Sequence, residues 1–235
     1  MLDENLEVKN KSLLTERFKY EEFKRKNLDG QRYYVNSNGD PVPSVTSILS
    51  KTKDMTALNA WKKRVGAAEA QRIVTESANL GTIMHKHLES YIEGVERPSG
   101  TNQVYVQAKN LSETIIENGL NNVDEVWGIE THLVFPGLYG GTADLICVHE
   151  GEPAIGDFKT ARKFKKKEWI HDYFMQASAY ALAHNEVYGT NIQKGVIFMV
   201  THDNQYQQFV VEGDEFKTFT NEWLDKVETY YKMNK

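Results

Sequence analysis

Two apolar stretches joined by a short turn constrain the fold of this chain more than any other feature. Residues 140–160 read GGTADLICVHEGEPAIGDFKT, in which Glu150-Gly151 separates the two stretches. Their composition and the turn between them predict an antiparallel β-hairpin. Three charged residues, Asp144, Asp157 and Lys159, interrupt these strands. A turn at Glu150-Gly151 places Asp144 opposite Asp157, and the two-residue period of a strand puts all three charges on one face.

Two facing carboxylates in an apolar hairpin create an electrostatic conflict. Directly opposed side chains have Cβ atoms about 4.5–5.5 Å apart, and burying an unpaired charge is strongly unfavourable. Lys159 can neutralise a buried triad, but one lysine beside two acids leaves a net negative charge. A divalent cation bound by both carboxylates removes the conflict, and hard oxygen ligands favour Mg²⁺ or Mn²⁺ over zinc.

The bulk composition narrows the class of protein. The net charge of −5 argues against a protein that coats nucleic acid indiscriminately, without excluding a local basic groove. A single cysteine, Cys147, excludes an internal disulfide and an iron–sulfur cluster, and it fits a reducing cytoplasm. No apolar run approaches the roughly 18 residues of a membrane span, and the first residues lack the apolar segment of a secretory signal. We expect a cytoplasmic protein of a bacterial cell or a phage-infected host, with no membrane partner, in preference to a mitochondrial matrix protein.

Hydrophobic periodicity and turn residues predict the other elements. Helices are expected over 13–26, over 56–93 with a break near Asn79-Leu80-Gly81, and over 102–118, 172–188 and 213–233. Strands are expected over 125–135, 141–149 and 153–160, with a later closing hairpin and an earlier one about Asn38-Gly39. This order predicts an α/β or α+β fold in one domain.

The three charges belong to a longer pattern of motifs. These are Gly141-Thr-Ala-Asp144, Asp157-Phe-Lys159 and Gln176-Ala-Ser-Ala-Tyr180. In them the chain resembles the RecB-like branch of the PD-(D/E)XK nuclease superfamily, with Ala143 where the family name has proline. His85 in GTIMHKHLESYI and the segment PSVTSIL at 43–49 extend the similarity over about residues 43–230, toward mitochondrial genome maintenance exonucleases and related phage and bacterial exonucleases.

The resemblance implies a restriction-endonuclease-like α/β core, in which helices flank a mixed central sheet, and an N-terminal helical arch. It implies one nuclease domain over 1–235. Its parts are an N-terminal extension (1–42), a helical part (43–120) and a sheet core with the catalytic hairpin (121–235).

The resemblance also implies roles for particular residues. The metal ligands are His85, Asp144, Asp157 and the Phe158 carbonyl, and Lys159 completes the catalytic set. The residues expected to bind substrate are Gln176, Tyr180, Ser44 and Thr46.

Each of these roles has a plainer alternative. His85 can be a core histidine, Gln176 and Tyr180 can pack the helix on the sheet, and Ser44 and Thr46 can cap a helix.

Three further assignments rest on position in the chain. Glu89 lies one helical turn after His85, where it can orient that histidine or a nearby lysine. Lys163 and Lys165 lie in a basic loop directly after Lys159, where they can attract phosphate or form ordinary solvated surface. Glu130 is either an acid near the site or an exposed strand residue, and we leave it out of the predicted metal ligands.

The predicted function is that of a metal-dependent DNA exonuclease, with Mg²⁺ or Mn²⁺ as cofactor. The expected partner is single-stranded DNA or DNA with free ends, threaded beneath the arch. Two alternatives remain open: a restriction-type or structure-specific endonuclease, and a non-catalytic nucleic-acid-binding module on the same fold.

Overall fold

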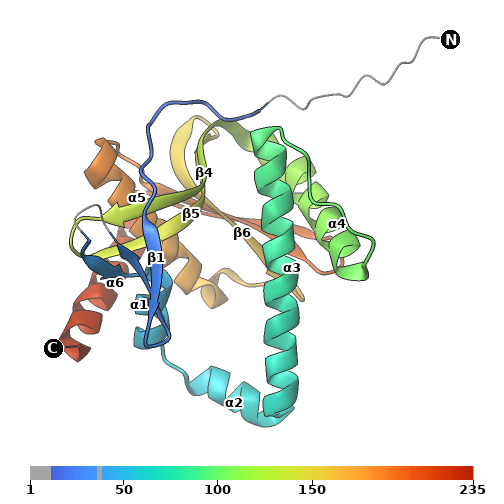
Figure 1. The fold of residues 1–235 in the computed structure, drawn as a ribbon, viewed down its shortest axis with the longest axis horizontal. Coiled ribbons are helices and arrows are strands. Elements are labelled where there is room, and N and C mark those ends of the chain that lie inside the picture. Colours follow the sequence, from blue (N-terminus) through green and yellow to red (C-terminus); the bar gives the residue numbers. More distant parts are fainter. Residues whose placement is uncertain (1–11, 36–38, 235) are drawn as a thin grey trace.

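A five-stranded mixed sheet forms the centre of the protein in a computed structural model, which describes residues 12–35 and 39–234 (Figure 1). Its strands lie in chain order and are antiparallel except for the parallel third and fourth strands. In sequence they are β4 (Val123–Phe135), β5 (Tyr139–His149), β6 (Glu152–Ala161), β7 (Lys194–Thr201) and β8 (Tyr206–Glu212). The predicted mixed α/β fold is confirmed.

Helices cover both faces of this sheet. One face packs against α3 (Ala67–Glu93) and α4 (Gln103–Asn118), and the other against α1 (Val45–Thr52), α5 (His171–Tyr188) and α6 (Gly213–Met233). Because each face has its own hydrophobic core, the central strands are apolar on both sides; every residue of β7 is buried. A charged side chain in these strands therefore has to find a partner inside the protein. Among residues 12–35 and 39–234, no helix has the length and hydropathy to cross a membrane.

The long helical region breaks at a different place from the one predicted. It divides into α2 (Thr56–Val65) and α3 at Gly66, whose φ of 85° is a conformation that glycine adopts readily. Residues 79–81 stay helical within α3. Helix α2 has no buried residue, and together with the first turns of α3 it extends away from the sheet (Figure 1).

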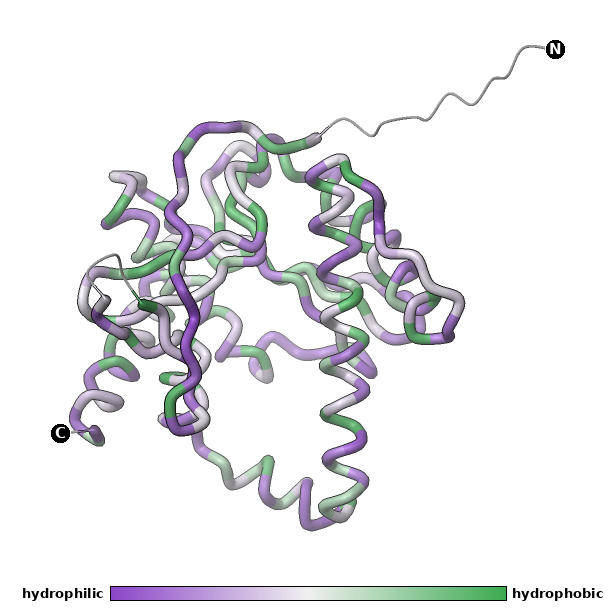
Figure 2. The backbone as a smooth tube through the Cα atoms, in the orientation of Figure 1, coloured by the Kyte–Doolittle hydropathy of each residue, from purple (hydrophilic) through white to green (hydrophobic). Residues whose placement is uncertain are grey.

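The helix predicted over 13–26 is wrong. Residues 13–23 have almost no regular secondary structure, and Phe18 and Tyr20 pack against His184 and Tyr188 of α5 instead of on a helix of their own. It leads into strand β1 (Lys24–Leu28), which is hydrophilic over most of its length (Figure 2).

A second, small antiparallel sheet contains β1, β2 (Gln31–Val35) and β3 (Pro41–Pro43). Strands β2 and β3 pair on either side of the predicted Asn38-Gly39 turn. Residues 36–38, like residues 1–11 of the predicted N-terminal extension, lie outside the described part of the chain. Buried Tyr34 packs with Val42 and Val134, so this small sheet lies against the central one.

Candidate metal centre

The hairpin of β5 and β6 has the predicted register. Its pairs run from His149–Glu152 to Leu145–Gly156, as a turn at Glu150-Gly151 requires. The ladder ends there, one pair before Asp144 and Asp157, and β6 continues beside β7 alone.

Asp144 fills the gap that the separating strands leave. Its Oδ2 accepts a hydrogen bond from the backbone N–H of Phe158 at 2.9 Å. The predicted direct pairing of Asp144 with Asp157 is therefore wrong in detail. The two carboxylates still lie close to each other at the point where the paired ladder ends.

Asp144, Asp157 and Lys159 form a buried cluster at this fork. Asp157 is only 2% exposed and Asp144 8% exposed. The Lys159 ammonium forms an ion pair with Asp157 Oδ2 and lies 3.9 Å from Asp144 Oδ2. Strand periodicity predicted that the three charged side chains share one face of the hairpin, and in the structure they lie together.

Helix α3 brings His85 to the same cluster. Its Nδ1 lies 3.7 Å from Asp144 Oδ2, and its Nε2 donates a hydrogen bond to the Phe158 carbonyl oxygen at 2.8 Å. That carbonyl, predicted as a metal ligand, is thus already a hydrogen-bond acceptor for His85. In this arrangement the carbonyl orients the imidazole so that Nδ1 faces the carboxylates, as the partners of metal-binding histidines commonly do.

Glu130 also belongs to the cluster, although the sequence did not place it there. Its Oε1 lies 3.3 Å from His85 Nδ1. One ligand atom each from His85, Glu130 and Asp144 lies within 4.8 Å of the others. Glu130 has a φ of 46°, in the left-handed region that glycine favours, between the paired residues Ile129 and Thr131 of β4. The backbone is strained at this position, as is often seen at functional sites.

The charges of the cluster shift one another's proton equilibria. Burial raises the pKa of Asp157 to about 7, in spite of the Lys159 ammonium beside it. Burial acts in the same direction on Asp144, but His85 and Lys159 outweigh it and hold the pKa of that carboxyl below its usual range. Burial lowers the pKa of His85, yet Asp144 and Glu130 together raise it to about 9. Opposite charges thus compete with desolvation at every one of these groups.

The donor set fits a divalent cation. With the carboxylates of Glu130, Asp144 and Asp157 all ionised and His85 neutral, the Lys159 ammonium leaves two negative charges. At neutral pH, protons on His85 and on part of the Asp157 population reduce this excess. A divalent cation that displaces these protons meets the full negative charge, and carboxylate oxygens with one imidazole are suitable ligands for it.

Helix α5 supports the cluster from the side. Gln176 Nε2 donates to Asp157 Oδ1 and to the Tyr180 hydroxyl, both at 3.4 Å. Tyr173, which the sequence did not single out, places its ring centroid 5.1 Å from the Lys159 nitrogen. Gln176 therefore contacts a carboxylate of the cluster, and Tyr173 provides the lysine with an aromatic face.

The other predicted residues differ in their surroundings. Ser44 caps α1 by accepting a hydrogen bond from the Ser47 N–H, and Ser44 and Thr46 both line a cavity beside the cluster. Glu89 forms an ion pair with Lys86 at 2.9 Å, so of its two predicted partners the lysine is the one it meets. Lys163 and Lys165 are exposed on the loop after β6 and do not line that cavity.

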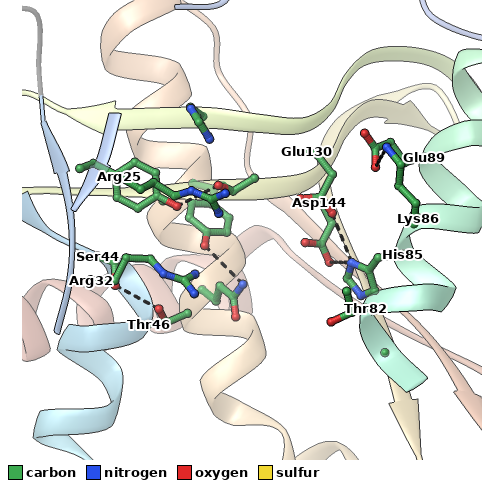
Figure 3. Close-up of a pocket in the computed structure, with 17 residues that line it drawn as sticks. Arg25, Arg32, Ser44, Thr46, Thr82, His85, Lys86, Glu89, Glu130 and Asp144 are labelled. Carbon is green, nitrogen blue, oxygen red and sulfur yellow. Dashed lines mark hydrogen bonds and ion pairs between the residues drawn. The ribbon is translucent and has the colours of Figure 1, made fainter. Parts of the chain in front are cut away.

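A cavity of about 620 Å³ opens beside the cluster. His85, Glu130 and Asp144 lie on one side of it, and Ser44, Thr46 and residues of the small sheet lie on the other (Figure 3). Gln176 and Tyr180 also line it. The cluster is thus open to a ligand larger than water, and the chain is an α/β protein with a candidate metal centre at the wall of an open cavity.

Comparison with known proteins adds two distant likenesses. No protein-family model and no curated protein matches the chain. Among solved structures it is similar to a protein of Eubacterium rectale named "Putative exonuclease", at 13% identity over 66% of this chain and 64% of that one, with a TM-score of 0.47. It is also similar to the structure of SSO0001, at 17% identity over 72% of this chain and 69% of that one, with a TM-score of 0.35. The chain spans less than two thirds of the length of the E. rectale protein.

Proposed function

We propose that this chain is a divalent-metal-dependent deoxyribonuclease that hydrolyses phosphodiester bonds, with Mg²⁺ or Mn²⁺ as the cation. One observation carries the proposal. His85, Glu130 and Asp144 line one side of an open cavity, Asp157 and Lys159 lie directly behind Asp144, and the ionised carboxylates give the group an excess of negative charge that a divalent cation balances.

His85, Asp144 and Asp157 are the ligands in this proposal, and Glu130 joins them or holds His85 in place. When bound, a divalent cation supplies a Lewis acid for a phosphate oxygen. Lys159 stays protonated because Asp157 and Asp144 raise its pKa against the effect of burial. Its ammonium stabilises the negative charge that develops on the phosphoryl oxygens and positions the attacking water. Gln176 keeps Asp157 in position through its hydrogen bond to Oδ1.

We propose that the enzyme acts as an exonuclease on single-stranded DNA or DNA ends. Helix α2 and the first turns of α3 extend away from the sheet, and His85 lies further along α3 (Figure 1). In this proposal the arm encloses a single strand, which then reaches the cluster only from an end. Exposed Lys163 and Lys165 lie on the loop after β6, where they attract the phosphate backbone.

Linear and circular substrates test the proposal. Single-stranded DNA labelled at its 5′ or 3′ end, and a closed single-stranded circle, are incubated with the protein in Mg²⁺ and in EDTA. We expect metal-dependent loss of the linear strands with the circle spared, and loss of cleavage in Asp144→Asn and Lys159→Ala. Lys217→Ala is the matched control, because Glu215-Phe216-Lys217 repeats the acid-Phe-Lys order on the exposed face of α6.

Two results contradict parts of the proposal. Cleavage of the circle makes the protein an endonuclease and rejects threading. Binding of DNA without any cleavage, in Mg²⁺ or in Mn²⁺, makes it a non-catalytic binding module.

A further inference from the structure

Two arginines face the candidate metal centre from the opposite wall of the cavity. Arg25 lies on β1 and Arg32 on β2, and both line the same cavity as His85 and Asp144. Figure 3 shows both side chains reaching into the cavity from the small sheet, toward the metal-centre side. One wall of the cavity is thus acidic and the other basic.

Strand register places the two arginines on one face of the small sheet. Arg25 pairs with Tyr34, and Arg32 precedes Tyr34 by two residues on the same strand. Directly opposed residues and residues two apart share a face, and diagonal neighbours lie about 7–8 Å apart. The two guanidinium groups are therefore within reach of one common ligand. Lys24 and Lys26, at the alternate positions of β1, belong to the opposite face and do not line the cavity.

The face that carries the arginines is fixed next to the metal centre. Tyr34 is 1% exposed, and its hydroxyl hydrogen-bonds to Thr142 Oγ1 at 2.8 Å. Thr142 precedes Asp144 by two residues on β5, so both belong to the same face of that strand. The positions of Arg25 and Arg32 relative to the candidate ligands are thus set by a buried contact.

Neither guanidinium has a partner within residues 12–35 and 39–234. The ion pairs and side-chain hydrogen bonds of this part of the chain involve other arginines, and the cavity wall near Arg25 and Arg32 offers hydroxyl groups, such as that of Thr46, instead of carboxylates. Both side chains are exposed, so solvent screens their mutual repulsion, and both guanidinium groups are free to bind one anion. Arginine forms two-pronged hydrogen bonds with phosphate oxygens, which suits this arrangement.

We propose that Arg25 and Arg32, with the Thr46 hydroxyl, bind a second phosphate group of the nucleic-acid strand, distinct from the phosphate held at the metal centre. This inference rests on the proposed function in taking nucleic acid as the ligand. The strand then spans the cavity, with one phosphate at each wall. The bound group is either a phosphodiester within the strand or a phosphomonoester at its end, and the two arginines recognise the chemistry that these share.

Binding measured without metal separates this site from catalysis. Fluorescence anisotropy of a labelled single-stranded oligonucleotide is recorded in EDTA over a series of salt concentrations. The test variant is Arg25→Gln/Arg32→Gln. The matched control is Lys24→Gln/Lys26→Gln, which removes the same charge from the same sheet on the opposite face. Arg25→Lys/Arg32→Lys keeps the charge and removes the two-pronged geometry. Thermal melting checks that each variant is folded.

We expect the glutamine double variant to bind at least about tenfold more weakly than its control, since a hydrogen bond to a charged group contributes about 1.5–3 kcal/mol. The slope of log affinity against log salt falls by about 0.7 for each phosphate that the protein no longer neutralises. Oligonucleotides with 5′-phosphate, 3′-phosphate or hydroxyl ends distinguish an internal phosphodiester from a terminal phosphomonoester as the bound group. Weaker binding confined to one phosphorylated end assigns the site to a terminal phosphate, and equally weakened binding of all ends assigns it to an internal phosphodiester.

Equal affinities of the two glutamine variants overturn the inference. The outcome is independent of the nuclease proposal. If no DNA is cleaved in Mg²⁺ and the arginine-dependent binding persists, the phosphate site stands without the enzyme. If DNA is cleaved and the arginines make no difference to binding, the enzyme stands without this site.

Discussion

Replacing Gly141 by alanine tests how the sheet and α5 meet at the site. A Cβ atom at this position lies 2.4 Å from Tyr180 Cε1 and 2.8 Å from the Tyr180 hydroxyl oxygen. An ordinary contact begins at 3.4 Å, so the ring has to retreat by about 1 Å in a close-packed interior. Tyr180 is 4% exposed and has little room to move. Overpacking of this kind destabilises a protein by about 1–3 kcal/mol.

Two measurements follow from that displacement. Urea denaturation should show that the free energy of unfolding falls by about 2 kcal/mol, which corresponds to a melting temperature lower by about 4–8 °C for a chain of this length. DNA cleavage should fall by up to about 100-fold, because Gln176 and Tyr180 shift together and a misplacement of 1 Å at a reactive site has effects of this size.

A double-mutant cycle isolates the cause. In a Tyr180→Leu background the shorter side chain leaves space for the new methyl group. Gly141→Ala should then change the free energy of unfolding by less than about 0.5 kcal/mol. If Gly141→Ala is equally destabilising in both backgrounds, contact with Tyr180 is not the reason for glycine at this position, and the reasoning is refuted.

Three further predictions concern the lysine, a buried histidine and the cation. Tyr173→Leu should slow DNA cleavage by about 3- to 30-fold and Tyr173→Phe far less, since a ring over the Lys159 ammonium contributes about 0.5–2 kcal/mol; single-turnover rates compare the two. Burial lowers the pKa of His184 to about 4, below the 6.5 of an unfolded chain, so stability is lost as pH falls through this interval. Urea denaturation should show that the wild type loses about 3 kcal/mol more stability between pH 7 and pH 4 than His184→Gln does. At 100 times its Kd, Mg²⁺ should stabilise the wild type by about 2.7 kcal/mol but leave the melting of Asp144→Asn nearly unchanged.

The hairpin of β5 and β6 could be predicted from the sequence because its geometry is local. A short turn and the two-residue period of a strand fix which residues face each other, and the register over Leu145–His149 follows from them. The end of the ladder before Asp144 could not be predicted, since it depends on β6 continuing beside β7, which is distant in sequence.

Glu130 was left out of the predicted ligands for a related physical reason. Two register shifts in β4, between Val123 and Glu125 and between Val126 and Gly128, cancel each other before Glu130, so alternation alone gives its face correctly. What brings Glu130 into the cluster is its contact with His85 of α3, which is 45 residues away in sequence. Arg25 was missed because the polar segment 13–26 suggests a solvated helix. The packing of Phe18 and Tyr20 on α5, which overrides that preference, is a long-range contact.

The distance in sequence between the members of the cluster has a consequence for the cell that makes this protein. His85 is 45 residues from Glu130 and 73 from Phe158, and each comes from a different element. A chain still emerging from the ribosome lacks β5 and β6 until most of it has been synthesised, so it holds no complete set of ligands. If the protein is a nuclease, its nascent and unfolded copies are harmless to nucleic acid, and the hazard begins only when folding is finished.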